Sequence, residues 1–245
     1  YELVNPMIEI GQVFACIGIS VFALIRFWNK EHRADVFEYL KWVPLAFVLF
    51  TYRALTRTIL EFYQGIGMAL KANDITWDIL QMKILVAQTR SMADYGVSWV
   101  LLQADPEALQ ALVLSSITSG ITAIASVISA VVFIGIKAMS VIYLFVLIVF
   151  GPLNIGLSFI PIFSGMWKAW LQKFMSVCLW IPMLYLIDNF MLHVLDKLIN
   201  ELLYDGEANL GLVLTSGLLM LMNVFVYLKA PVLSNFIVQD MNVSA

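Results

Sequence analysis

Two ionisable side chains, those of Asp188 and His193, fall inside an otherwise apolar stretch and are the first candidates for chemistry. A carboxylate inside a membrane-spanning helix is costly, and by default it faces a bundle interior or a water-filled cavity. His193 follows roughly one and a half helical turns later, so the two groups share no clean helix face. Two interpretations stay open: a proton relay, or an acid near the outer end of its helix that is solvated or protonated.

A second polar group consists of Arg53, Arg57 and Glu61, which follow one another at four-residue spacing. In a helix these side chains form one stripe, and Arg57 can pair with Glu61 one turn later. The stripe is either a polar seam that faces a pore or a partner, or the solvated face of a helix at the membrane surface.

The sequence lacks the familiar motifs of catalytic and metal sites. It contains no P-loop, no HExxH, no CxxC and no GxSxG pattern. Cys16 and Cys178 lie in apolar stretches, and His32 is far from His193 in the sequence, so no set of metal ligands can be assembled from spacing. We therefore expect no enzymatic activity, no cofactor, and no catalytic or metal-binding residue.

The composition excludes most other classes of protein. Of the 245 residues, 62% are hydrophobic and 13% are charged, against roughly 45–50% and about 25% in soluble domains. So little charge cannot cover a soluble surface, and a disordered chain needs the opposite composition. The net charge of −3 and the lack of a basic block argue against nucleic-acid binding. A polytopic membrane protein remains.

Uncharged runs predict an all-α protein with five or six transmembrane helices. The runs cover residues 10–25, 108–136, 138–167, about 174–195 and about 208–228, and the mixed segment 42–62 would supply a sixth span. Asp105-Pro106-Glu107 is a favourable helix start. Apolar residues at helical intervals predict an amphipathic helix near 73–104, which lies on the membrane or against a neighbouring subunit.

The chain is expected to have three parts. Residues 1–107 hold the first span, a wet loop at 29–41 and the amphipathic helices; residues 108–231 form a transmembrane bundle; residues 232–245 form a polar tail. Lysines in the 168–173 loop and at Lys229 place the C-terminus in the cytoplasm by the positive-inside rule. The orientation of the N-terminus depends on whether 42–62 spans.

Special residue types mark three features of the bundle. Gly151-Pro152 predicts a kink or break within the run 138–167, and the irregularity continues to Pro161. An interfacial anchor is predicted at Trp167, Lys168 and Trp170. Two small-xxx-small series predict close helix packing within or between protomers. They consist of Ser115, Ser119 and Ala123, and of Ser126 and Ala130.

A family pattern is visible in the segments 150–157 (FGPLNIGL) and 167–170 (WKAW), followed by a further span. This arrangement resembles the TrbL/VirB-type polytopic inner-membrane subunits of type IV secretion systems, and is most similar to TraJ proteins of Bacteroides-type conjugative transposons. The likeness covers residues 110–230 best. The family has no catalytic residues to transfer, so the resemblance implies a structural role for Gly151, Pro152, Trp167 and Trp170.

The resemblance also implies an oligomeric ring in the bacterial inner membrane, at the base of a conjugative DNA-transfer channel. Its partners would be periplasmic stalk or pilus subunits, other inner-membrane components and a transient DNA or protein substrate. Two alternatives stay open. One is a small-solute secondary transporter or ion channel that uses Asp188 in a broken-helix bundle. The other is a membrane-embedded enzyme, for which Asp188 and His193 offer few groups.

Overall fold

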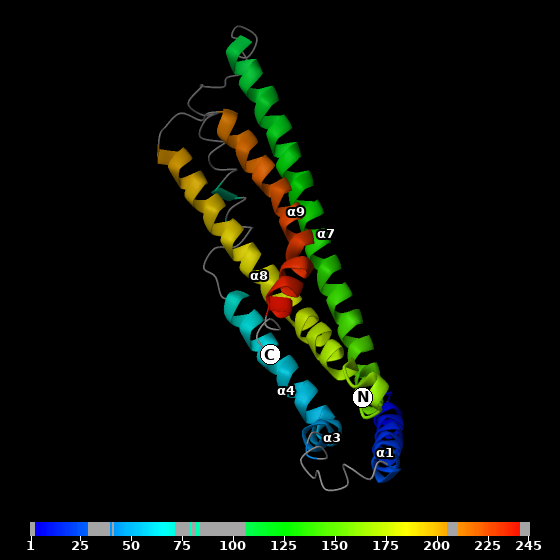
Figure 1. The fold of residues 1–245 in the computed structure, drawn as a ribbon. Helices are drawn as coiled ribbons and strands as arrows, with labels where there is room; N and C mark the ends of the chain where they lie inside the picture. Colours follow the sequence, from blue (N-terminus) through cyan, green and yellow to red (C-terminus); the bar gives the residue numbers. More distant parts are fainter. Residues whose placement is uncertain are drawn as a thin grey trace. The chain divides into compact units, whose positions relative to one another are not determined.

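The computed structural model describes residues 3–28, 40, 42–71, 79, 82–83, 106–204 and 210–240, with some side chains in these ranges, such as those of Ser115 and Ser119, left aside (Figure 1). The elements are α1 (Val4–Trp28), α3 (Trp42–Phe50), α4 (Tyr52–Lys71), α7 (Pro106–Leu157), the 3-10 turn η2 (Pro161–Phe163), α8 (Met166–Tyr204) and α9 (Leu210–Asp240). No strand occurs among the described residues, so the predicted all-α class is confirmed.

Four of the described helices are long and apolar enough to cross a membrane. They include Val4–Ile25, Ala123–Leu157, Pro161–Glu201 and Leu221–Val238. The pair α3 and α4 passes the same test together but is bent by 78°, as in a broken span or a re-entrant loop, and it would make a fifth. A multi-pass membrane protein is therefore supported, with four candidate spans among the described residues, or five if the bent pair crosses as one span, against the five or six expected.

Helix α7 corrects two expectations about where the chain breaks. The runs 108–136 and 138–167 belong to one helix through Lys137, and this helix also continues through Gly151 and Pro152 to Leu157. The chain leaves the α-helix only in the following turns, where Pro161 begins η2. The predicted helix start, by contrast, agrees with the structure, since α7 begins at Pro106.

The chain folds into two compact units, and each of α7, α8 and α9 contributes to both. Unit 1 comprises Tyr1–Ile66, Ala138–Ile181 and Pro231–Ala245. Its core joins α1, α3, the start of α4, the end of α7 and the start of α8. The buried residues of this core are Val4, Ala15, Leu45, Leu49, Tyr52, Val149, Ile155, Phe159, Trp170, Phe174 and Cys178.

Unit 2 comprises Gly67–Lys137 and Pro182–Ala230. Its core places Ala125 of α7 against Leu192, Leu195 and Ile199 of α8, and residues of α9 pack on the cluster. These α8 residues recur every three or four positions, so they form the apolar stripe that a helix buries.

Several predicted segments fall outside the description or end elsewhere. The wet loop at 29–41 and the amphipathic helix at 73–104 lie outside the described residues, apart from Leu40, Ile79, Met82 and Lys83. Helix α9 continues through Pro231 to Asp240, nine residues beyond the predicted end of the bundle at 231.

Candidate functional site

Helix α7 continues through Pro152 because side chains of other helices replace the missing hydrogen bond. Proline has no amide hydrogen, so the carbonyl of Ile148, four residues earlier, lacks its helical donor. The hydroxyl of Tyr52 donates to this carbonyl at 2.8 Å. The indole of Trp170 donates to the neighbouring carbonyl of Leu147 at 2.9 Å. Two buried aromatic residues from α4 and α8 therefore support the backbone around the proline.

Gly151 provides the space for these two side chains. A Cβ atom at this position would lie 2.1 Å from the Tyr52 hydroxyl and 2.7 Å from the Trp170 ring. The rings of Tyr52 and Trp170 have centroids 5.7 Å apart, and Trp170 stacks on Phe174 at 5.3 Å. The glycine and proline thus form one packing unit with three aromatic residues.

Three glycines let α1 approach the end of α7 and the turn after it closely. A Cβ atom on Gly156 would lie 2.3 Å from the carbonyl oxygen of Gly11, and one on Gly11 would lie 2.4 Å from that of Pro152. One on Gly18 would meet the backbone of Phe159 at 2.6 Å. The two backbones touch here, a contact that only glycine permits.

The turn after α7 is tied to the start of α8. The Ser158 hydroxyl donates to the Asn154 carbonyl at 2.7 Å and accepts from the amide of Trp167 at 2.9 Å. Of the predicted anchor, Lys168 is exposed, with its ammonium 5.9 Å from the Trp167 ring centroid. Trp170 instead belongs to the core of unit 1, at 4% exposure.

Replacing Tyr52 with phenylalanine should lower the free energy of unfolding by about 1–3 kcal/mol, because the buried Ile148 carbonyl loses its donor. Pro152→Ala restores an amide at that position. In a chain that carries Pro152→Ala, the substitution Tyr52→Phe should therefore lower the free energy of unfolding by less than it does in the original chain. Thermal unfolding of the purified protein in detergent measures the cycle, with Tyr143→Phe, half-exposed on α7, as the control. Additive effects would contradict this account of the proline.

The second candidate site lies inside unit 2, around the predicted residue Asp188. The hydroxyl of Tyr227, on α9, donates to the carboxylate of Asp188, on α8. Tyr227 is 2% exposed, and Asp188 is half-buried. Ser129 of α7 and Asn223 of α9 lie beside the Tyr227 hydroxyl. The carboxylate therefore faces the contact of three helices, where the sequence alone had named only the acid.

Lys137 lies in the same unit, and its contacts explain why α7 continues through this charged residue without a solvent-exposed loop. Its ammonium donates to the Tyr185 hydroxyl at 2.7 Å and lies 4.3 Å and 4.4 Å from the ring centroids of Phe133 and Tyr185. A hydroxyl and two aromatic faces compensate for part of the lost hydration. The Phe133 ring also contacts the Tyr227 ring, with centroids 5.4 Å apart. Phe133 therefore contacts both Lys137 and the tyrosine that binds Asp188.

The predicted partner of Asp188, His193, is placed differently. Its side chain is exposed, and Nδ1 lies 2.8 Å from the carbonyl oxygen of Asn189 on its own helix. The structure therefore does not join Asp188 and His193 into a relay. Tyr227 could be found in the sequence only as one of nine tyrosines.

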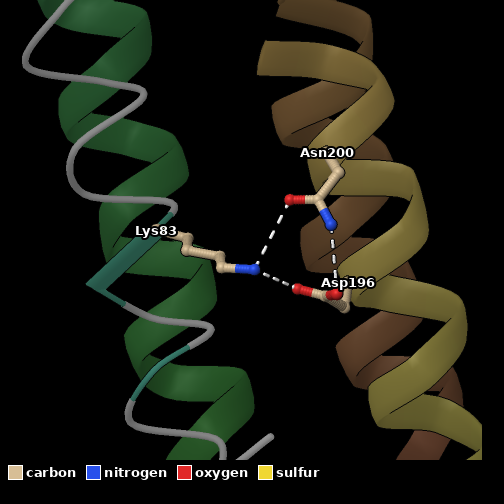
Figure 2. Close-up of polar contacts among 3 residues, drawn as sticks. All are labelled: Lys83, Asp196 and Asn200. Carbon is tan, nitrogen blue, oxygen red and sulfur yellow. Dashed lines mark hydrogen bonds and ion pairs between the residues drawn. The ribbon is translucent and has the colours of Figure 1, made fainter. Parts of the chain in front are cut away.

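Figure 2 shows a third polar cluster, at the far end of α8 in unit 2. Lys83 pairs with Asp196 at 2.5 Å, and the side chains are 35% and 17% exposed. Asn200 donates to the same carboxylate at 3.0 Å and accepts from Lys83 at 3.4 Å. The cluster ties Lys83 to α8, and sequence spacing did not indicate it.

The remaining predicted residues lie on outer faces. Arg57 and Glu61 form the expected pair at 2.7 Å, with side chains 72% and 60% exposed, so it contributes little stability. Arg53 is exposed as well.

Of the small-residue series, Ala123 and Ala130 are exposed and Ser126 is half-buried; the side chains of Ser115 and Ser119 lie outside the description. Among the described side chains of α7, the alanine and serine residues that are buried within the fold are Ala125, Ser129 and Ser140.

Comparisons with known proteins add no identity to this arrangement. No family model, no curated protein and no solved structure matches the chain. Among the described residues, no group of three or more histidine, cysteine, aspartate or glutamate side chains is placed to hold a metal ion. The two sites are therefore interpreted from their own chemistry: an aromatic support for a proline-containing helix in unit 1, and a buried polar cluster between three helices in unit 2.

Proposed function

We propose that the chain is a structural, non-enzymatic subunit of a multi-subunit membrane assembly, the inner-membrane channel or scaffold subunit of a type IV secretion machine for conjugative DNA transfer. The motif segments 150–157 and 167–170 support this role, because their glycine, proline and tryptophan residues build the core of unit 1. The proposed partners are further copies of the chain and the other subunits of such a machine.

The observation that supports an assembly most directly is the uncovered apolar surface of α7. The helix has 52 residues, which gives it a length of about 78 Å, whereas the hydrocarbon core of a bilayer is about 30 Å thick. Its spanning segment Ala123–Leu157 has a mean hydropathy of 2.5, and only 6% of the most apolar window is buried within the fold. One crossing of a bilayer cannot cover so long an apolar helix, so we infer that neighbouring protein chains cover part of it.

We propose a bacterial inner-membrane location with the C-terminus in the cytoplasm. Lys168 and Lys173 follow the turn between α7 and α8 and support this orientation, whereas Lys229 lies in the middle of the candidate span Leu221–Val238 and does not mark its end. Because α7 is one helix, it counts as one crossing, and the side of the N-terminus depends on whether the number of spans is four or five. If the bent pair α3 and α4 does not cross, the N-terminus is cytoplasmic, and if the pair crosses, the N-terminus is outside.

The oligomeric state of the purified protein tests this proposal. In mild detergent the protein should form a complex of several copies, measured by light scattering and native mass spectrometry. The combined substitution Ala123→Leu and Ala130→Leu should dissociate it, because two added side chains on the exposed face of α7 prevent close approach. Ala54→Leu, at an exposed alanine on α4, is the size-matched control and should leave the complex intact.

A secondary transporter or ion channel is the second candidate function, because unit 2 holds two half-buried charged residues, Asp188 and Lys137, each bonded to a tyrosine hydroxyl. A monodisperse monomer that moves a solute across liposomes, and loses this activity in Asp188→Asn, would favour the transporter and contradict the scaffold.

A further inference from the structure

Helix α4 packs along α8 and has the length of one membrane crossing. Its 20 residues extend over about 30 Å, which equals the thickness of the hydrocarbon core of a bilayer. Within unit 1, the ring centroids of Tyr52 on α4 and Trp170 on α8 lie 5.7 Å apart. Further along both helices, the Tyr63 hydroxyl donates to the sulfur of Met175 at 3.6 Å. Both contacts advance toward the C-terminal ends, so the two helices run in the same direction.

The segment of α8 that α4 follows is apolar. It belongs to the candidate span Pro161–Glu201, and Lys173 is the only charged residue between positions 169 and 187. Within unit 2, the Asn189 side chain of α8 donates to the carbonyl of Leu70, close to the end of α4. Because α4 stays beside this span, a bilayer that surrounds α8 also surrounds α4.

The exposed surface of α4 is divided into a polar and an apolar stripe. A helix turns by about 100° per residue, so residues three or four positions apart share a face. The polar stripe consists of Arg53, Arg57, Glu61, Gln64 and Lys71, with Met68 among them. The apolar stripe consists of Ala54, Phe62, Gly65 and Ala69, with Thr58 among them. The two stripes require different surroundings.

Lipid suits the apolar stripe but not the polar one. The side chains of Arg57 and Glu61 pair at 2.7 Å and remain 72% and 60% exposed. Ionisable side chains at membrane depth are costly in contact with lipid, and they face either a protein interior or a water-filled cavity. Because the stripe is exposed, the described residues of this chain supply no such interior. Water at the depth of the membrane satisfies these groups.

We propose that the polar stripe of α4 lines a water-filled passage at the depth of the membrane, while the apolar stripe faces lipid. The opposite wall of the passage is not among the described residues. A second copy of the chain supplies it, because the uncovered apolar surface of α7 already requires neighbouring chains. The inference therefore rests on the assembly proposed above. The stripe carries three basic residues and one acid, so the passage favours anionic solutes over cationic ones.

Collision rates of nitroxide spin labels measure which stripe meets water. The native thiols are first removed by Cys16→Ser and Cys178→Ala. The full chain, labelled at Gln64→Cys or at Phe62→Cys, is reconstituted into vesicles of phosphatidylcholine and phosphatidylglycerol. Both side chains are exposed, and the two positions differ by only about 3 Å in depth, so they form a matched pair. The label at 64 should collide more often with a water-soluble nickel chelate, and the label at 62 with oxygen, which dissolves in lipid.

Each other pattern of collisions would overturn the proposal. Two labels that both meet the nickel chelate would place α4 in water outside the bilayer. Two labels that both meet oxygen alone would place the polar stripe in lipid. A label at Gln64→Cys that meets neither probe would show that packed protein covers the stripe.

Charged thiol reagents test the preference for anions. In sealed vesicles, the ratio of the rates with an anionic and a cationic methanethiosulfonate reagent should be higher for Gln64→Cys than for a free thiol in solution. Adding Glu61→Gln removes the acid of the stripe and should raise this ratio further. Phe62→Cys should react more slowly with both reagents, because a thiol in lipid forms little thiolate. A ratio at or below that of the free thiol would contradict the preference for anions.

Light scattering on the same protein separates this inference from the assembly on which it rests. An oligomer whose label at Gln64→Cys avoids water contradicts the passage and leaves the assembly in place. A monomer contradicts the assembly, and it removes the opposite wall of the passage as well. An oligomer whose label at Gln64→Cys meets water, while that at Phe62→Cys meets lipid, supports both.

Discussion

Gly156→Ala should lower the free energy of unfolding by about 2–3 kcal/mol, near the upper end for overpacking of a core. The new Cβ atom would lie 2.3 Å from the carbonyl oxygen of Gly11 and 2.7 Å from its Cα atom. Both are backbone atoms of α1, so no side chain can rotate away and the helices must separate. Thermal or SDS-induced unfolding in detergent, followed by tryptophan fluorescence, measures the change.

Gly135→Ala is the matched control for this substitution, because it lies on the same helix and an added Cβ atom there meets no atom within 4 Å. Alanine is the better helix former, so this variant should be more stable by about 0.5–1 kcal/mol. Equal effects of the two substitutions would show that α1 does not pack on α7 through its glycines.

Trp170→Ala should have the largest effect of any single substitution considered, a loss of about 3–5 kcal/mol. The side chain is 4% exposed, packs against Tyr52 and Phe174, and donates to the carbonyl of Leu147. Its removal leaves a cavity beside Gly151 and a backbone carbonyl without its indole donor. The unfolding midpoint of unit 1 should fall, or the protein should fail to accumulate in the membrane.

Two further variants distinguish packing from hydrogen bonding at Trp170. Trp170→Phe keeps an aromatic ring but removes the indole donor, so its loss should be smaller than that of the alanine variant. Trp28→Ala, at a side chain that is 90% exposed on α1, should change the stability little. If Trp170→Ala behaves like Trp28→Ala, the aromatic support of α7 is not a feature of the folded protein.

Local sequence signals predicted the helices well where the deciding contacts are local. The apolar runs predicted the membrane helices, Pro106 predicted the start of α7, and four-residue spacing predicted the pair of Arg57 and Glu61. Each of these features depends on residues within one or two turns of the same helix. Apolar composition is also a local signal, because a helix that faces lipid needs no particular protein partner.

The candidate sites were only partly visible in the sequence. Pro152 implied that some group must donate to the carbonyl of Ile148, but the donor, Tyr52, is 96 residues away. Asp188 was identifiable as a costly acid, whereas its partner Tyr227 is 39 residues further on and Ser129 belongs to another helix. Side-chain partners between helices depend on rotation and axial shift, which the spacing within one helix does not define.

By itself, the sequence determined that this protein is a bundle of apolar helices, because so little charge leaves the membrane as the only suitable solvent. Only the tertiary structure decided that α7 is one helix rather than two. A charged lysine at 137 is costly inside a membrane span and a proline at 152 removes a helical hydrogen bond, but here Tyr185 bonds to the ammonium and Tyr52 donates in place of the missing amide. Whether a helix tolerates such a residue depends on hydrogen-bond partners that other helices supply. These partners come into place only when the helices pack.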